Sequence, residues 1–230
     1  MTKIVVIDFW YTLPDLGALD HILRDYTDKH ANIALFMERH IKVLSLFLSS
    51  LRKFTKFDTL CLHALELSLL DAGVSLSLEQ MEEIVSRISN VQLFDEVDDT
   101  LLELKDKGYQ IALYTILSSK TTQEILKTNK VDHLIDYIET AEDHPALLPS
   151  IESIKHIVNR FQPLVDDPTH LYFVSGSAFS CGAAKTAMIE GLKVIRVARP
   201  PKAVPCFGFV PCPNAVVSNL RDVLTIIDDV

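Results

Sequence analysis

The sequence predicts an α/β protein: a doubly wound parallel sheet with a helical cap subdomain inserted after the first strand. Three features support this fold class. From about residue 97 onward, short apolar runs alternate with segments of helical periodicity. Before that series, roughly 75 residues show helical spacing alone. One apolar strand precedes the helical block, so we predict a core of residues 1–14 and 92–230 and a cap of residues 15–91.

The first strand is the apolar, β-branched run of residues 3–7, and it ends on the carboxylate of Asp8. A buried parallel strand places its last residue at the carboxyl edge of the sheet, where α/β proteins bind their ligands. Asp8 is therefore the first candidate for chemistry, although an acid at a strand end can equally be a helix cap or a solvated turn residue.

The cap is expected to be entirely helical, because apolar residues recur at helical spacing from about residue 16 to residue 88. Two of its helices are expected over residues 56–72 and 78–88. Asp58 and Ser77 are candidate N-caps, and Gly73 is a candidate C-terminal stop.

The rest of the chain is expected to alternate between helix and strand. The segment 200–214 is rich in Pro and Cys and is expected to be irregular, and Ser218 is a candidate N-cap for the last helix. The expected helices are 96–107, 119–128, 150–161, 178–189 and 218–228, and the expected strands are 110–115, 136–139, 171–175 and 193–197.

The bulk composition restricts the partners. A net charge of −9 over 230 residues argues against binding to nucleic acid or to an anionic membrane surface. No apolar run approaches the roughly 18 residues that cross a bilayer, and the N-terminus lacks the order of a signal peptide. We expect reduced cysteines rather than a bridge between Cys206 and Cys212. These features predict a cytoplasmic protein, with a homodimer left open.

Three segments carry residues that the sheet would bring to one edge. Residues 8–13 read Asp-Phe-Trp-Tyr-Thr-Leu, residues 104–115 end a strand on Thr115, and residues 174–183 read Val-Ser-Gly-Ser-Ala-Phe-Ser-Cys-Gly-Ala. In this order and spacing they resemble the first, second and fourth motifs of the haloacid dehalogenase superfamily, and within it the L-2-haloacid dehalogenases. The resemblance covers nearly the whole chain and implies a Rossmann-like core with a cap. It implies catalytic roles for Asp8, Arg39, Thr115 and Ser175, with Arg39 at the position of a cap arginine that holds the substrate carboxylate and the halide.

Five positions depart from the pattern of those dehalogenases. The third-motif Lys is Leu148, the fourth-motif Asp is Ser180, and the Asn that positions the hydrolytic water is Ser177. The first-motif Gly is Tyr11, and a Tyr of the dehalogenase pocket falls on Ile154. The residues that serve the water and the carboxylate are thus replaced, while the carboxylate itself persists.

The same departures argue against metal chemistry. Phosphatases of this superfamily hold Mg²⁺ through the first-motif Asp, an acid two residues later and the fourth-motif acid. Here those positions are Asp8, Trp10 and Ser180, and one carboxylate beside an indole does not supply octahedral oxygen ligands. We therefore expect no metal and no other cofactor.

The loss of the third-motif Lys changes what Asp8 can do. A buried carboxylate without a neighbouring cation is harder to ionise, which weakens it as a nucleophile and favours it as a general acid or base. Leu148, Trp10 and Tyr11 also make the expected pocket apolar.

The function these residues predict is non-hydrolytic acid–base catalysis (an isomerase, lyase or cyclase) on a small apolar organic molecule held between core and cap. One alternative is a metal-independent hydrolase or 2-haloacid dehalogenase with Asp8 as nucleophile, its water activated through His144 or a serine. Another is a binding protein without activity. Arg39 is expected to face Asp8, although it could be a solvated residue, and the serines could simply cap a helix. The expected substrate-binding residues are Phe9, Trp10, Tyr11, Thr12, Leu148, Ser177 and Ser180.

Overall fold

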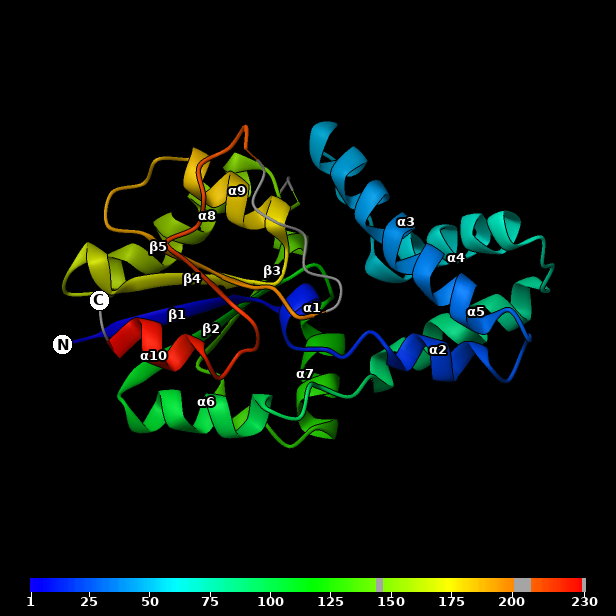
Figure 1. Ribbon diagram of the computed structural model, residues 1–230, viewed down its shortest axis with the longest axis horizontal. Helices are drawn as coiled ribbons and strands as arrows, with labels where there is room; N and C mark the ends of the chain where they lie inside the picture. The colour runs from blue at the N-terminus through cyan, green and yellow to red at the C-terminus, as the bar shows by residue number, and fades with distance from the viewer. Residues whose placement is uncertain (144–146, 201–207, 229–230) are drawn as a thin grey trace.

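The protein is an α/β core with a helical lobe beside it, and the computed structural model describes residues 1–143, 147–200 and 208–228 (Figure 1). Six strands pair in parallel in the order β3-β2-β1-β4-β5-β6, which is the doubly wound arrangement that the sequence predicts. The strands are β1 Lys3–Asp8, β2 Tyr109–Thr115, β3 Tyr137–Thr140, β4 Leu171–Ser175, β5 Lys193–Val197 and β6 Ala215–Val217.

The parallel register gathers the ends of the central strands at one edge. Ile7 of β1 lies opposite Val174 of β4, so Asp8 and Ser175 follow side by side at the carboxyl edge. Ser175 in turn lies opposite Arg196 of β5. The strand order reverses between β1 and β4, and ligands of such sheets bind at this switch point.

Both faces of the sheet are covered, which explains why its strands are apolar throughout. Successive side chains of a strand point to opposite faces: Val5 and Ile7 belong to one buried cluster, Ile4 and Val6 to the other. The helices α6 (Val97–Asp106), α7 (Ser119–Thr128) and α10 (Val223–Asp228) cover the first face, and α8 (Ile151–Phe161) and α9 (Ala178–Thr186) cover the second (Figure 1).

The second lobe contains helices alone and leaves the core after a short helix, α1 (Phe9–Thr12). The two chain segments that join the lobes are hydrogen-bonded to each other, with Pro14 bridged antiparallel to Leu93 and the Phe94 N–H donating to the Leu13 carbonyl at 3.0 Å. The lobe consists of α2 Ala18–Leu23, α3 His30–Ser50, α4 Phe57–Ala72, α5 Leu78–Arg87 and the 3₁₀ turn η1 Ile88–Asn90.

The C-terminal end of α3 returns to the core. The Ser49 hydroxyl donates to the Leu147 carbonyl at 3.0 Å, and Arg52 forms an ion pair with Glu152 at 2.8 Å. Leu48 packs against both buried clusters. The lobe therefore contacts the core at its linkers and at this helix end, and also where Trp10 packs against Phe57 of α4.

Of the four helix caps predicted from the sequence, two are confirmed and two are wrong. Ser77 caps α5 in a full capping box, and Gly73 ends α4 with φ +62°, but Lys56 rather than Asp58 is the N-cap of α4. The last helix starts at Val223 rather than Ser218, whose hydroxyl instead donates to the Asp222 carboxylate at 2.8 Å.

Two further differences lie in the segments before and after β5. The strand β6 is absent from the sequence prediction, because three residues are too few to show a periodicity. The helix α9 ends at Thr186, three residues early, since Met188 takes a left-handed backbone conformation with φ +49°.

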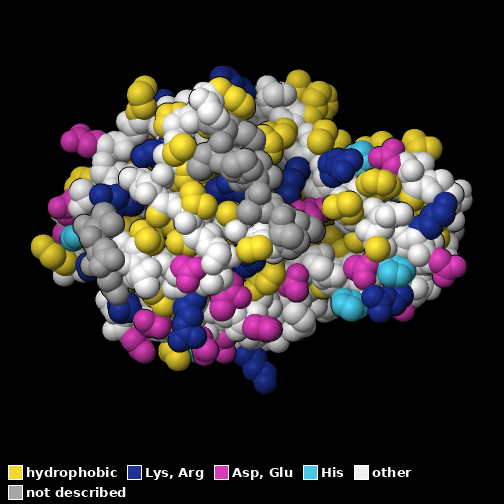
Figure 2. Space-filling model, viewed as in Figure 1, with side chains coloured by type: hydrophobic (Ala, Val, Ile, Leu, Met, Phe, Trp, Pro, Cys, Tyr) yellow, Lys and Arg dark blue, Asp and Glu magenta, His cyan; other side chains and the backbone are white. Residues whose placement is uncertain are grey.

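Among the described residues, Cys61, Cys181 and Cys212 form no disulfide bond, while Cys206 lies outside the described residues. In the described part of the chain no helix combines the length and apolar character needed to cross a bilayer. Acidic and basic side chains are interspersed over both lobes on the face shown in Figure 2.

Candidate functional site

Asp8 lies at the end of β1, at the switch point of the sheet, and is 5% exposed. Its Oδ2 accepts a hydrogen bond from the Ser175 hydroxyl at 2.7 Å. The helix α1 starts at the next residue, so the chain turns away from the sheet directly after the carboxylate. The expected pairing of Asp8 with the fourth-motif segment is thus present in the fold.

The protonation of Asp8 is set by two opposing effects. Burial raises the pKa of Asp8 from its ordinary value of 3.8 to about 6, because water no longer solvates the charged form. Hydrogen bonds from the Ser175 and Ser180 hydroxyls lower this pKa, Ser175 more than Ser180, since both stabilise the carboxylate. Within the described residues, hydroxyl groups rather than cations offset the cost of burying this charge.

The three serines after β4 have separate roles. Ser175 binds Asp8 and also accepts a hydrogen bond from the Ser177 N–H at 3.0 Å. The Ser177 hydroxyl accepts from the Ser180 N–H at 3.2 Å and so caps α9. Ser180 supplies the second hydroxyl to Asp8. Helix capping, the structural alternative for these serines, therefore holds for Ser177.

Trp10 and Tyr11 fill the space between Asp8 and the helical lobe. Trp10 is 1% exposed and packs edge-on against Phe57 of α4, with ring centroids 4.5 Å apart. Burial and the charge of Asp8 raise the pKa of Tyr11, so its phenol stays protonated, while a hydrogen bond with Ser45 of α3 lowers this pKa. Within the described residues, the indole N–H of Trp10 has no hydrogen-bond partner.

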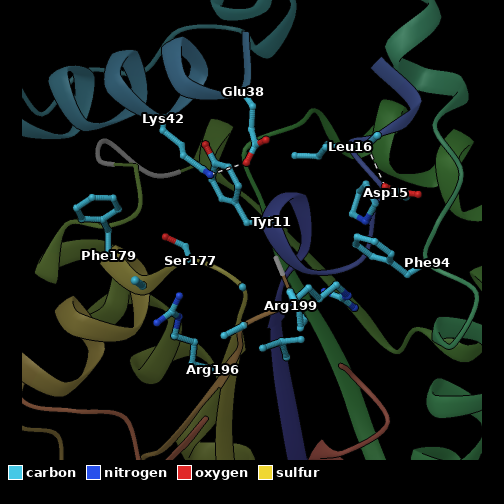
Figure 3. Close-up of a pocket in the computed structure, with 17 residues that line it drawn as sticks. Tyr11, Asp15, Leu16, Glu38, Lys42, Phe94, Ser177, Phe179, Arg196 and Arg199 are labelled. Atoms are coloured by element: carbon cyan, nitrogen blue, oxygen red, sulfur yellow. Dashed lines mark hydrogen bonds and ion pairs between the residues drawn. The ribbon is translucent and has the colours of Figure 1, made fainter. Parts of the chain in front are cut away.

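A cavity of about 540 Å³ opens beside Tyr11, between α3, the start of α9 and the end of β5 (Figure 3). Glu38 and Lys42 reach into it from α3 and form an ion pair at 2.7 Å, and the Lys42 ammonium lies 5.5 Å from the centre of the Tyr11 ring. The full lining is Tyr11, Pro14, Asp15, Leu16, Gly17, Glu38, Lys42, Phe94, Gly176, Ser177, Ala178, Phe179, Arg196, Val197, Ala198, Arg199 and Pro200.

A second cavity, of about 420 Å³, lies where the helical lobe meets the start of α7. Lys56 and Phe57 of the lobe and Ser118 and Lys120 of the core are among its walls. Asp8 lines neither of the two cavities. Tyr11, which is close enough to Asp8 to feel its charge, also lines the cavity of about 540 Å³.

The structure corrects the expectation that Arg39 faces Asp8. Arg39 is exposed, its guanidinium lies 5.8 Å from the centre of the Phe36 ring, and it lines neither cavity. The reason is helical geometry: Glu38 and Lys42, one turn apart, face the core, and Arg39 is rotated by about 100° from Glu38. The cation that α3 brings to the site is Lys42.

The remaining expected residues have structural contacts. Phe9 is fully buried in the hydrophobic core and lines neither cavity. The Thr12 hydroxyl accepts from the Gly176 N–H at 3.0 Å, and the buried Thr115 hydroxyl accepts from the Leu117 N–H at 3.1 Å. Leu148 is half-buried against the second core cluster. His144 lies outside the described residues.

The residues around Asp8 do not fit a magnesium ion. The position two residues after Asp8 is the buried Trp10, and the fourth-motif position is the hydroxyl of Ser180. Mg²⁺ requires several hard oxygen ligands in octahedral geometry, which one carboxylate and two hydroxyls satisfy poorly. Among the described residues, no group of three or more His, Cys, Asp or Glu side chains is placed to hold a metal.

Sequence reasoning missed Glu38, Lys42, Ser45 and Arg196. A signal existed for the cap residues, because positions 38, 42 and 45 share one face of a predicted helix. Arg196 is a charged residue inside an otherwise apolar predicted strand, 193–197, which is unusual enough to be noticed.

Comparisons with known proteins agree with this architecture. The model of the family "Haloacid dehalogenase-like hydrolase" matches residues 58–194. The (S)-2-haloacid dehalogenase 4A of Burkholderia cepacia is 24% identical over 137 residues, 60% of this chain and 56% of that protein. The phosphoglycolate phosphatase of Pasteurella multocida (strain Pm70) is 28% identical over 139 residues, 56% of this chain and 61% of that protein. The chain thus matches little more than half the length of these curated relatives.

The fold similarity extends further than the sequence similarity. The structure of an L-2-haloacid dehalogenase from Xanthobacter autotrophicus, with chloropropionic acid covalently bound, superposes with a TM-score of 0.84. The superposition covers 99% of both chains at 18% sequence identity, a level at which the fold is shared.

Proposed function

Because this chain belongs to the haloacid dehalogenase-like hydrolase family, we propose that it is a metal-independent hydrolase with Asp8 as its nucleophile. The substrate would be a small organic molecule with a displaceable group, such as a 2-halo acid. The family membership and the dehalogenase relative support hydrolysis ahead of the non-hydrolytic chemistry that the sequence alone suggests.

The observation that carries the proposal is the state of Asp8. A buried carboxylate with a pKa of about 6 is about nine-tenths ionised at neutral pH, so it can still act as a nucleophile there. Its Oδ2 is held by Ser175 at 2.7 Å, which fixes the direction of the carboxylate. The poor fit to Mg²⁺ favours attack on carbon without a metal over phosphoryl transfer with one.

The reaction would take two steps. A carboxylate oxygen of Asp8 forms a bond to the substrate carbon while the bond to the leaving group breaks, which gives an ester and a released anion. Water then adds to the carbonyl carbon of that ester, the alcohol product leaves, and the Asp8 carboxylate is restored with a solvent oxygen in it. The hydroxyls of Ser175 and Ser180 would orient the carboxylate in both steps.

A single turnover in ¹⁸O-water tests this proposal. Intact-protein and peptide mass spectrometry should find label in Asp8 after one turnover with a 2-halo acid that releases halide. The variant Asp8→Asn should remain folded by circular dichroism and release no halide above background. If halide is released without label in Asp8, the ester mechanism is refuted.

A second candidate is the acid–base enzyme (isomerase, lyase or cyclase) predicted from the sequence. The pKa of about 6 favours it, since a group that titrates near neutrality can both give and take a proton. This candidate predicts turnover with no label in Asp8. It also predicts that Leu148→Lys slows the native reaction, because a nearby cation would lower the pKa of Asp8.

A further inference from the structure

The larger cavity is built for a ligand bigger than a small halo acid. Its volume of about 540 Å³ lies within the ~300–1,000 Å³ of pockets that bind drug-sized molecules. It shares Tyr11 with the surroundings of Asp8, and it meets Ser177, whose N–H binds the same Ser175 hydroxyl that donates to Asp8. The cavity is therefore linked to the surroundings of the candidate nucleophile through Tyr11 and Ser177, although Asp8 itself does not line it.

The cavity lining has one more basic than acidic side chain, whereas the chain as a whole is acidic. Three cationic side chains, Lys42, Arg196 and Arg199, line it together with two carboxylates, Asp15 and Glu38. Figure 3 shows Arg196 rising from β5 toward Ser177, and Figure 2 shows basic side chains near the junction of the two lobes. With a net charge of −9, the chain as a whole repels anions, so an anionic ligand needs such a local cluster.

The three cations differ in how they are held. The Arg199 guanidinium carbon lies 3.8 Å from the centre of the Phe94 ring, and Nη2 pairs with Glu96 Oε1 at 2.6 Å. These two contacts hold the Arg199 side chain in place. Lys42 pairs with Glu38 but keeps 38% of its side chain exposed. Arg196 is 3% exposed, and a charge in such a desolvated position attracts an anion more strongly than a surface charge does.

The rest of the wall is apolar. Phe94 lies on the linker side of the cavity and Phe179 on the α9 side (Figure 3). Pro14, Leu16 and Val197 add further apolar surface to the lining. Phe179 is 43% exposed, which leaves a large aromatic surface at the mouth of the cavity. Such a combination suits a ligand with an apolar body and one charged end.

We propose that this cavity binds an organic carboxylate with an apolar or aromatic body, the carboxylate at Lys42 and Arg196 and the body between Phe94 and Phe179. That this ligand is the substrate rests on the proposed function of Asp8. That the cavity binds such a carboxylate rests on the cavity lining alone and can be tested with an acid that does not react.

The test is calorimetric titration of the full chain with three probes: 3-phenylpropanoate, its neutral amide and phenyl phosphate. The carboxylate should bind about tenfold or more tightly than the amide, since charge-assisted hydrogen bonds are roughly twice as strong as neutral ones. Equal binding of acid and amide, or binding of phenyl phosphate in preference to the carboxylate, would overturn the assignment.

Matched variants locate the site. Lys42→Met should weaken binding of 3-phenylpropanoate about tenfold and leave the amide unchanged, whereas Lys42→Arg should stay within about threefold of wild type. Arg196→Gln should weaken binding of 3-phenylpropanoate to a similar extent. If the substitution of the buried Arg196 prevents folding, the result for Lys42→Met tests the site. Lys120→Met, in the second cavity, is the control and should have no effect. If Lys120→Met weakens binding and Lys42→Met does not, the ligand occupies the other cavity.

The two proposals can fail separately. Asp8→Asn should bind 3-phenylpropanoate like wild type, because Asp8 does not line the cavity. Absence of probe binding would refute the ligand class and leave the ¹⁸O result untouched, while absence of label in Asp8 would refute the nucleophile and leave the binding site standing.

Discussion

Replacing Ser175 by Ala should raise the pKa of Asp8 and shift any activity that depends on its carboxylate to higher pH. The Ser175 hydroxyl donates to Oδ2 at 2.7 Å, and this hydrogen bond stabilises the ionised form. A hydrogen bond to a charged group contributes about 1.5–3 kcal/mol, and 1.36 kcal/mol corresponds to one pKa unit, so the pKa should rise by roughly 1–2 units from about 6. The ionised fraction at pH 7 would then fall from about nine-tenths to between about half and a tenth.

The pKa itself is measurable by ¹³C NMR titration of protein labelled at the aspartate carboxyl carbons, with the Asp8 signal assigned by its absence in Asp8→Asn. Ser177→Ala is the matched control, because that hydroxyl caps α9 rather than binding Asp8. It should cost about 1 kcal/mol of stability and leave the Asp8 titration in place. A Ser175→Ala titration that is unchanged or moves to lower pH would show that this hydroxyl does not hold the carboxylate.

Three further predictions concern stability and metal dependence. Burial raises the pKa of Asp8 from 3.8 to about 6, so the contribution of Asp8 to stability is present below pH 3.8 and is lost as the pH rises through about 6. Asp8→Asn should therefore be more stable than wild type at pH 7, by up to about 3 kcal/mol. In urea titrations this difference in stability should vanish near pH 4. Gly176→Ala should cost about 3 kcal/mol or more, because its Cβ would lie 2.0 Å from the Tyr11 carbonyl oxygen. A Cβ at Gly208 meets no atom of the described residues within 4 Å, so Gly208→Ala is the control and should leave the melting temperature unchanged. Activity should survive EDTA, because the indole of Trp10 and the hydroxyls of Ser175 and Ser180 add no second carboxylate to Asp8 for Mg²⁺ to bind; loss on chelation that Mg²⁺ restores would contradict this account of the site.

The fold could be predicted from the sequence because its signals are local. The strands at residues 171–175 and 193–197 and the helix at 119–128 have the predicted bounds, since each is a periodic run between clear breakers. Ser77 caps a helix through its side chain, and Gly73 ends one through its left-handed backbone. Both caps can be predicted from a few neighbouring residues of the sequence. The order of the elements then leaves few topologies for a parallel sheet.

The sequence by itself also determined that Asp8 ends the first strand. Tertiary structure decided the rest of the site. Ser175 reaches Asp8 across 167 residues of chain, through the pairing of β1 with β4, and no local pattern specifies that hydrogen bond. Whether Arg39 or Lys42 faces the core depends on the rotation of α3 about its axis. Packing against α4 and the contacts at the end of α3 set that rotation. The sequence does not show it, since an exposed charged residue and a cavity-lining one about a turn apart look alike in sequence.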